Sequence, residues 1–464
     1  MPSRIQNIVT FISSCMSMAT AGAMFSFSVV EGGIKEKLQL SSSDINTITG
    51  VGNSSLYLSF LFIGPLYDRI GARWTLFLGA LIFASGYLLM FFALDLKIAS
   101  STVAMSVYYF IVGIGSTCSY MACVGANVKN LGGTSYEGKA LAILLLCYGL
   151  SATIFSQICI SYFLNNAGGL LLFSAIVVGV VNLIAAAFTF ETASLSTLST
   201  EKRSSSIASV QIVSSSNRVQ VSKSFESGEF KETIKLIGAT SEPESTMQIL
   251  TSPLFWCFAL TLIFMQGLTY MTDFFMILEA AEGQQRVESD PDGVARQNAM
   301  HVTIMSVFNS LGRLTIPLFC DLFISYRTKF DRSILLLICQ VLALVSTIIL
   351  AAGAQSQVAL IACSVIGSYA FGGAGATFPV LTKDFFGTKR YGTACGLVMA
   401  GVPAGILLSN LIFGVFYDAE SNGAKKCLTP SCYSKSFSVF SGIQCISIVT
   451  AAIVFGLRMS KKQV

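Results

Sequence analysis

The sequence predicts an all-α integral membrane protein whose twelve transmembrane helices form two six-helix halves. Three observations support this prediction. Hydrophobic residues make up 53% of the 464 positions and charged residues only 11%, and the mean hydropathy is +0.70, values that exclude a soluble protein of this length. The chain contains a dozen apolar runs near the length of about 20 residues that a bilayer requires. A charged turn after the second run has a weaker copy at the corresponding place in the second half.

The first half, residues 1–190, contains six of these runs. The first run is longer than the core of a signal peptide and no cleavage pattern follows it, so we expect it to remain in the protein as helix 1. Gly113 and Gly115 in the fourth run offer small surfaces on which membrane helices pack closely. The predicted helices cover residues 8–30, 45–65, 74–94, 102–127, 140–164 and 168–190.

A polar segment, residues 191–250, separates the two halves. It is rich in Ser, Glu and Lys and includes two runs of three serines, at 204–206 and 214–216. Such a segment is too polar to span a membrane and too poor in apolar residues to fold alone. We therefore predict a largely disordered cytoplasmic linker, and whether its serines are phosphorylated stays open.

The second half, residues 251–464, repeats the layout of the first. Its predicted helices cover residues 253–278, 302–323, 334–353, 358–381, 391–417 and 437–458. Pro317 to Asp321, with Arg327 and Lys329, follow its second helix as the charged turn follows helix 2. This correspondence indicates an internal duplication.

The charged turn between helices 2 and 3 covers residues 64–73. Gly64 lets a neighbouring backbone approach, and Gly71 can adopt the positive φ that ends such a turn. Arg69 and Arg73 favour the cytoplasmic side of the membrane. Asp68 lies at the C-terminal end of its own helix, where the macrodipole disfavours a negative charge, so we expect it near the N-terminus of another helix as an interhelical latch.

The order G-x-L-x-D-R-x-G-x-R in this turn resembles the motif between helices 2 and 3 of the major facilitator superfamily. The resemblance covers nearly the whole chain except the linker. It implies the major facilitator fold, with a monomeric unit that transports by alternating access between two six-helix bundles. It also implies that the five turn residues named above, together with Asp321, act as the conformational latch.

Residues 308–313 and 385–393 narrow the resemblance to the nodulin-like branch and the fungal monocarboxylate-transporter-homologue group. This resemblance implies secondary active or facilitative transport of a small solute, with a monocarboxylate or another organic anion as the expected cargo. It also implies a vacuolar membrane, with the plasma membrane as the alternative. The alternative function is a transporter-like nutrient receptor, which binds a solute without net transport.

The distribution of Lys and Arg predicts the orientation. With both termini and the linker in the cytoplasm, 20 of the 29 basic residues lie on the cytoplasmic side and eight on the other, which leaves Arg313 in the membrane. This asymmetry agrees with the positive-inside rule. Both termini are therefore predicted to be cytoplasmic.

Several other classes of protein are excluded. The net charge of +5 is dispersed over short loops and forms no patch for nucleic acid. One His among 464 residues cannot supply ordinary metal sites, and we expect neither a metal nor a cofactor. No nucleotide-binding loop or catalytic triad is evident, so an enzyme is not predicted.

Arg313 is the strongest candidate for the solute site. An arginine inside a span costs about 2.5 to 3.5 kcal/mol on insertion scales, so it should face a cavity or a partner. At 1.5 Å per residue along helix 8 it lies roughly 15 Å deep, near the midplane where transporters bind solutes. The alternative is a structural arginine that snorkels to the surface.

In monocarboxylate transporters, helix 8 carries Phe, Asp, three further residues and Arg, and the resemblance implies that the Arg binds the substrate carboxylate. Phe308 and Arg313 match this pattern, whereas Asn309 replaces the Asp that serves proton coupling. The resemblance therefore supports anion binding in this chain more strongly than proton coupling.

Further polar residues within the spans are candidates for the cavity wall, with interhelical hydrogen bonding as the alternative role. They are Gln266, Tyr270, Asn309, Tyr148 and Asn410. Asp273, near the outer end of helix 7, is a candidate outer-gate or proton site or, alternatively, an interfacial carboxylate.

Most of the 13 cysteines lie inside apolar runs and are expected to pack as small hydrophobes. Only Cys427 and Cys432 share a loop, on the predicted non-cytoplasmic side, and they flank Pro430. A loop this short can bring two sulfurs within disulfide range. We predict a local disulfide there.

Overall fold

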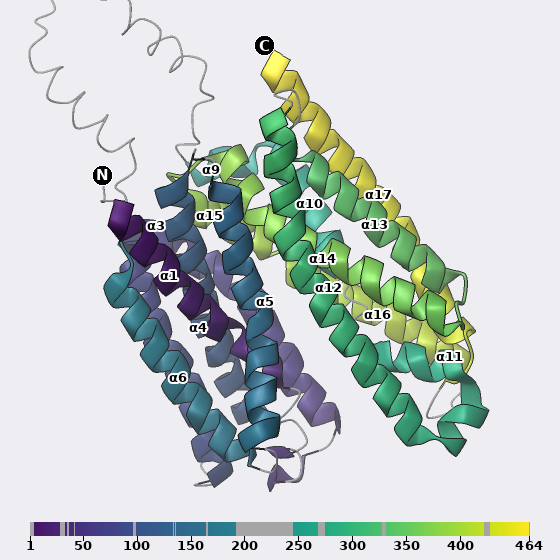
Figure 1. Ribbon diagram of the computed structural model, residues 1–464. Helices are drawn as coiled ribbons and strands as arrows, with labels where there is room; N and C mark the ends of the chain where they lie inside the picture. The colour runs from purple at the N-terminus through teal and green to yellow at the C-terminus, as the bar shows by residue number, and fades with distance from the viewer. Residues whose placement is uncertain are drawn as a thin grey trace, which may run out of the picture.

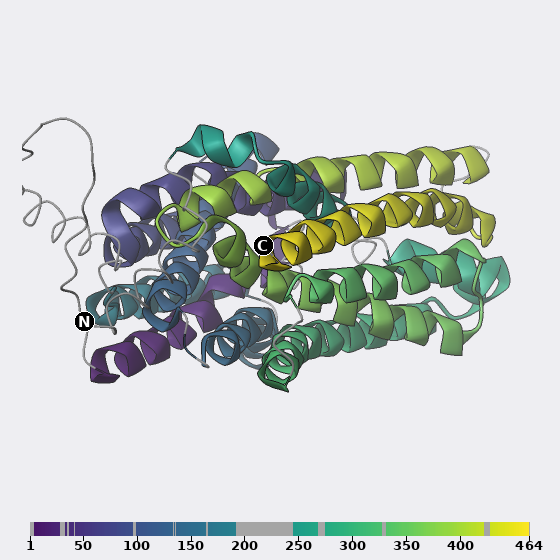
Figure 2. The same ribbon diagram turned by 90° about the horizontal axis from the view of Figure 1, so that it is seen from above.

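The computed structural model describes residues 4–27, 33–34, 37–40, 42–95, 99–132, 134, 136–163, 166–191, 245–267, 274–326, 331–421 and 427–463. Within these ranges the regular structure is entirely helical. The helices fall into an N-terminal and a C-terminal group that lie side by side (Figures 1 and 2).

The N-terminal group contains α1 (Arg4–Ala21), the 3₁₀ segment η1 (Gly22–Ser26), α3 (Ser42–Asp95), α4 (Thr102–Leu131), α5 (Glu137–Tyr162) and α6 (Ala167–Phe188). The C-terminal group contains α9 (Thr246–Leu250), α10 (Pro253–Gly267), α11 (Phe274–Ser289), α12 (Pro291–Tyr326), α13 (Ile334–Ala351), α14 (Gln357–Phe386), α15 (Tyr391–Met399), α16 (Val402–Ser421) and α17 (Ser431–Gln463).

The predicted twelve-helix fold class is confirmed. Ten helical segments of the described chain are long and apolar enough to cross a membrane, and one of them, within α3, is 49 residues long. Gly71, with φ 78°, divides α3 into two spans at the predicted turn. The shorter apolar helix α10 supplies the twelfth span.

Two predicted helices differ from the structure at their boundaries. Helix 8 begins at Pro291, eleven residues before the predicted start at 302. Asp290 caps this helix by accepting a hydrogen bond from the Gly293 N–H at 2.9 Å, and proline is favoured in a first helical turn because it has no N–H to leave unpaired. The predicted helix 11 is divided into α15 and α16 around Gly401, just before Pro403.

Helix 7, predicted as one run from 253 to 278, is also different. Its first part, α10, ends at Gly267, and the next described helix, α11, begins at Phe274 and continues past the predicted end to Ser289. Within α11 the chain turns at Gly283, where φ is 76°. The polar residues after 278 therefore form helix rather than a loop.

The predicted linker, 191–250, lies outside the described residues over 192–244. Its last residues are ordered, contrary to the prediction that they belong to a disordered segment. Ser245 and Gln248 form a reciprocal capping box at the start of α9, and Ile249 is fully buried. A capping box satisfies two of the donors that a helix start leaves free, which explains how so short a helix forms here.

The bundle has two distinct ends. We call the terminal end the one at which α1 starts and α17 finishes (Figure 1). At this end the start of α15 lies beside α3, and α9 contacts α10 and α15. The far end is the opposite one, where α11 and the start of α17 lie. These names carry no assumption about the side of the membrane.

The buried apolar residues form three clusters that distinguish these ends. One cluster joins the halves near the terminal end and contains Ile63 and Tyr67 of α3 with Tyr391 and Val398 of α15. The other two lie toward the far end and are each confined to one half, residues 23–178 and 274–440. The halves therefore share a core at the terminal end and pack separately at the far end.

Candidate functional site

The charged turn of α3 binds the first turn of α15. One carboxylate oxygen of Asp68 accepts a hydrogen bond from the Gly392 N–H at 2.9 Å, and the other accepts from the Thr393 N–H and hydroxyl, both at 2.7 Å. The first N–H groups of a helix have no partner inside the helix and carry the positive end of its dipole. Asp68 thus lies at the N-terminus of a helix in the opposite half.

Glycines allow the backbones of α3 and α15 to meet at this point. A Cβ added to Gly64 would collide with the Gly392 carbonyl, and one added to Gly396 would collide with the carbonyl of Phe60. A Cβ on Gly71 would lie 2.9 Å from a carboxylate oxygen of Glu191. A larger residue at Gly64 or Gly396 would force the two helices apart, whereas at Gly71 it would meet a side chain of its own half and a backbone with positive φ.

The two arginines of the turn have a different environment. Arg69 and Arg73 are both exposed, as expected for residues at a bilayer surface. Asp321, the corresponding acid of the second half, lies in α12, but its side chain is outside the described part. The structure therefore brings Gly64 and Asp68 to the contact between the halves, places Gly71 beside Glu191 of its own half, and leaves both arginines exposed.

A second polar contact joins the halves at the terminal end. Lys383, in the last turn of α14, forms an ion pair with Glu137 at the start of α5. Glu137 is only 2% exposed, so its charge depends on this partner far more than a surface carboxylate would. Together, the Asp68 contact and the Glu137–Lys383 pair, which we call the two clasps, connect α3 to α15 and α5 to α14.

Arg313 projects from α12 toward α5 of the opposite half. Its Nε donates to Asn309 Oδ1 at 3.0 Å, and its guanidinium carbon lies 5.9 Å from the centre of the Tyr148 ring. A Cβ added to Gly149 would lie 3.5 Å from Arg313 Cδ. Gly149 thus lies within van der Waals range of the Arg313 side chain, which reaches the N-terminal half at this point.

Three tyrosines of the N-terminal half surround this guanidinium. Tyr57 of α3, Tyr120 of α4 and Tyr148 of α5 all lie within electrostatic range of the Arg313 charge. In the described part of the chain, neither the hydroxyls of Tyr57 and Tyr120 nor the terminal amino groups of Arg313 form a hydrogen bond. Arg313 also has no carboxylate partner among these residues.

This arrangement gathers hydrogen-bond donors around one positive charge. Arg313 and Tyr57 are partly buried, and a charged or polar group that lacks a partner at membrane depth is costly. An anion placed between the halves would satisfy both requirements at once. The chemistry of the site is thus suited to binding an anion.

Several predicted site residues are placed elsewhere or not described. Asn309 lies directly beside Arg313, as its spacing of one helical turn implies. Asn410 is exposed on α16 and forms no hydrogen bond with the described chain. The side chain of Gln266 and the whole of Tyr270 and Asp273 lie outside the described residues.

Tyr57 and Tyr120 were not predicted as site residues. Each is a polar residue inside an apolar run, which is the same signal that identifies Tyr148. Sequence periodicity cannot separate a face toward lipid from a face toward a cavity when both faces are apolar. Only the tertiary structure, in which α3 and α4 pack against α15, brings these two tyrosines near Arg313.

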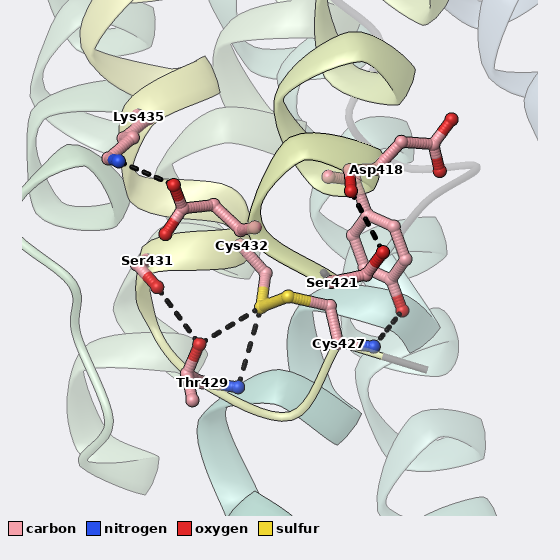
Figure 3. The surroundings of a disulfide bond; sticks show 9 residues. Asp418, Ser421, Cys427, Thr429, Ser431, Cys432 and Lys435 are labelled. Atoms are coloured by element: carbon pink, nitrogen blue, oxygen red, sulfur yellow. Dashed lines mark hydrogen bonds and ion pairs between the residues drawn. A yellow bond between two sulfur atoms is a disulfide. The ribbon is translucent and has the colours of Figure 1, made fainter. Parts of the chain in front are cut away.

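Cys427 and Cys432 are joined as a disulfide at the far end (Figure 3). The bond links the segment that follows α16 to the start of α17. The Cys427 N–H donates to the Tyr417 hydroxyl of α16 at 3.0 Å, and Glu420 of α16 pairs with Lys435 of α17. Three separate contacts thus hold these two helix ends together.

In the described part of the chain, no group of three or more His, Cys, Asp or Glu side chains is placed to hold a metal.

Two family models match this chain. The model described as Major Facilitator Superfamily matches residues 10–323. The model described as NFD4, C-terminal domain, matches residues 254–462. The two matches overlap between α10 and α12 and together cover nearly all of both halves.

Fungal proteins named "Probable transporter MCH1" are similar to this chain. The Gibberella zeae protein is 30% identical over 163 residues, a match that spans 32% of this chain and only 28% of that protein. The Candida albicans and Saccharomyces cerevisiae proteins are 20% and 21% identical, covering 96% and 98% of this chain and 91% and 93% of their own lengths. The resemblance to the fungal monocarboxylate-transporter-homologue group is confirmed.

Solved transporter structures share the fold. FucP, described as a major facilitator superfamily transporter in the outward conformation, superposes with a TM-score of 0.62 at 15% identity, over 95% of this chain and 99% of its own. The proton:xylose symporter XylE, bound to 6-bromo-6-deoxy-D-glucose, gives a TM-score of 0.62 at 14% identity, over 96% and 94%. At these identities the likeness concerns the fold alone.

Proposed function

The chain belongs to the major facilitator superfamily and is a multi-pass membrane transporter of a small solute, and we propose that this solute is an organic anion with a carboxylate group. Arg313 binds the carboxylate, and Asn309 holds the guanidinium in place through Nε. Proteins of this family are transporters and not enzymes, so the site binds and releases its solute unchanged.

The guanidinium without a described counter-ion is the observation that carries this proposal. Because a charge inside the bilayer is expensive, an anionic solute that enters the site recovers part of that cost. The two terminal amino groups of an arginine match the two oxygens of a carboxylate in a bidentate contact. The hydroxyls of Tyr57 and Tyr120 supply neutral donors beside it.

A purely structural role for Arg313 is the main alternative. A snorkelling arginine extends along its own helix toward the bilayer surface. Arg313 instead lies against the Tyr148 ring and beside Gly149, both on the opposite half. This position between the two halves favours a role in solute binding.

We propose that transport proceeds by alternating access and that the described conformation opens at the far end. The shared core and the two clasps at the terminal end, together with the separate cores at the far end, support this assignment. The Lys and Arg bias places the terminal end in the cytoplasm. The anion would then enter from the non-cytoplasmic side, in a vacuolar membrane by likeness to the fungal group, or in a plasma membrane.

Countertransport in proteoliposomes tests the function. The purified protein should exchange a labelled carboxylate for the same unlabelled anion inside the vesicle. Arg313→Ala should abolish this exchange, and Arg313→Lys should keep the charge yet lose most of the affinity because an ammonium cannot bind both oxygens in a planar fork. Arg4→Ala, an exposed arginine at the start of α1, is the matched control and should transport normally.

Three outcomes would separate the alternatives. If Arg313→Ala inserts normally and carries its anion at the wild-type rate, the anion proposal is wrong and a neutral or cationic solute takes its place. Saturable binding without any flux would indicate the nutrient receptor instead. Asn309→Asp should make transport pH-dependent, because it restores a titratable group one turn from Arg313.

A further inference from the structure

A row of four aromatic rings crosses the N-terminal half beside Arg313. Phe25 meets Tyr148 at a centroid distance of 6.0 Å, Tyr148 meets Tyr120 at 5.3 Å, and Tyr120 meets Phe60 at 5.5 Å. All three contacts are edge-to-face, with interplanar angles of 88°, 75° and 82°. The rings come from η1, α5, α4 and α3 respectively, so the packing of four separate elements builds this row.

The row is buried at one end and open at the other. Phe60, Tyr120 and Tyr148 are all buried, whereas Phe25 is 41% exposed. Met24 and Ser26, on either side of it, are both buried. Phe25 is thus a single ring that projects from an otherwise buried segment.

The position of Phe25 differs from that of a phenylalanine in contact with lipid. Phe62, 71% exposed on α3, lies next to the exposed Leu61 and one turn from the exposed Leu58, a pattern typical of a lipid-facing stripe. Phe25 instead packs on Tyr148, the residue whose ring lies 5.9 Å from the Arg313 guanidinium. Phe25 is therefore an exposed ring in contact with the residue that also lies beside Arg313.

Phe25 and Arg313 share Tyr148 as a neighbour at nearly equal distances, 6.0 Å and 5.9 Å. Tyr148 thus has a cation of the C-terminal half and an exposed aromatic ring of the N-terminal half as neighbours. In the described chain no acidic side chain forms an ion pair with the cation. A ligand that touches both would need one anionic group and one apolar, flat body.

We propose that Phe25 and Tyr148 form the subsite for the body of the transported anion, so that the solutes are carboxylates with an aromatic or similarly flat unsaturated body. This inference rests on the proposed anion function. The carboxylate binds the terminal amino groups of Arg313, and the body packs on the Phe25 ring. Aromatic rings prefer offset or edge-to-face contacts, and the row already presents such an edge-to-face array.

Binding to the purified full-length protein tests this proposal. Benzoate, acetate and the neutral benzamide are the probes, and dissociation constants are measured by titration calorimetry. An aromatic contact contributes about 0.5 to 1.5 kcal/mol beyond its buried area, so this contact alone should make benzoate bind the wild type about 2- to 13-fold more tightly than acetate, and the buried apolar area of the ring adds to this preference. Benzamide, which has the ring without the charge, should bind far more weakly than benzoate.

Phe25→Ala should remove most of the preference for benzoate over acetate. Phe25→Leu keeps an apolar side chain without a ring and should retain only part of the preference. Phe62→Ala is the matched control and should keep it in full. Because the preference is a ratio of two constants measured on one preparation, it does not depend on the fraction of each variant that is folded.

The two proposals fail in different ways. If benzoate and acetate bind equally well and Arg313→Ala abolishes both, the aromatic subsite is refuted while the anion function stands. The same conclusion follows if Phe25→Ala keeps the full preference. If benzamide binds as tightly as benzoate, or Arg313→Ala binds benzoate normally, the anion function itself is refuted, and the subsite proposal with it.

Discussion

The two ends of the bundle are held together by different forces. At the terminal end the halves meet through glycine-mediated backbone contact, the Asp68 hydrogen bonds and the Glu137–Lys383 pair. At the far end each half has its own apolar core. The terminal end thus combines directional polar contacts, which can be exchanged for water at modest net cost, with the apolar core that the two halves share there. Opening the terminal end therefore requires both these polar contacts and the shared apolar surface to separate.

The comparison also shows how each half can move as a unit. In the N-terminal half, Ser17 of α1 bonds to Asn182 of α6, and Asn127 of α4 bonds to Ser14 of α1. In the C-terminal half, Thr261 of α10 bonds to Thr450 of α17. These buried side-chain bonds tie the first helix of each half to its last. Motion is therefore expected between the halves rather than within them.

The largest effect is expected from Gly64→Ala, which disturbs the close contact between α3 and α15 at the terminal end. The added methyl group collides with the Gly392 carbonyl, and overpacking of this kind costs about 1 to 3 kcal/mol, which lowers the population of the state closed at the terminal end by about 5- to 160-fold relative to the open state. Transport by countertransport assay should fall by a similar factor.

Gly50→Ala is the matched control for Gly64→Ala, because it lies on the same helix and a Cβ there meets nothing within 4 Å. It should transport at nearly the wild-type rate. If both variants lose transport equally, the loss comes from helix propensity or insertion, and the close approach of α3 and α15 has no special role.

The Glu137–Lys383 pair should give an intermediate effect. Glu137→Gln leaves the Lys383 charge without its buried partner, and breaking a partly buried pair of this kind costs more than a surface pair. We expect transport to fall by about 10-fold, the equivalent of 1.4 kcal/mol. The charge swap Glu137→Lys with Lys383→Glu should recover part of the lost transport. A swap no better than either single change would show that the two residues do not act as a pair.

The smallest effect on transport is expected at the far-end disulfide. The loop it closes has a sequence separation of only five residues, so its constraint on the unfolded chain is at the low end of the usual range, about 2 kcal/mol. Replacing Cys427 and Cys432 by Ser should lower the melting temperature while transport stays within about two-fold. Alkylation of both thiols in oxidised membranes without prior reduction would disprove the bond.

The sequence predicts the terminal end well because its contacts depend on local chemistry. Gly71 has the positive φ that its place in the turn demands, and Asp68 lies at a helix N-terminus, where its charge is favoured. The Glu137–Lys383 pair could not be predicted, since 246 residues separate its members. The early start of α12 was missed although Asp290 and Pro291 carry a recognisable helix-start signal. The Asp-Pro signal was outweighed by the polar residues that follow it.

The site itself is predicted in part. An arginine in a span is conspicuous in any sequence, and Asn309 follows from helical spacing. The rings that face Arg313 come from the other half of the chain, and nothing local marks Phe25 or Tyr120 as its neighbours. In a lipid environment both sides of a helix are apolar, so the side toward the cavity is determined by packing alone.

Distances measured at both ends of one protein test the central claim, that the two ends open alternately around Arg313. Spin labels at Arg73 and Lys389 report the terminal end, and labels at Val103 and Val358, both exposed at the starts of α4 and α14, report the far end. The exposed Cys445 is replaced by Ser in this background.

The variant Asp68→Asn weakens the contact between Asp68 and α15, because a neutral amide loses the charge-assisted hydrogen bonds. We predict that pulsed electron–electron double resonance will show a longer distance between the terminal-end labels, and a shorter distance between the far-end labels, in this variant than in the wild type. Distances that stay the same at both ends, or lengthen at both ends together, would contradict the account.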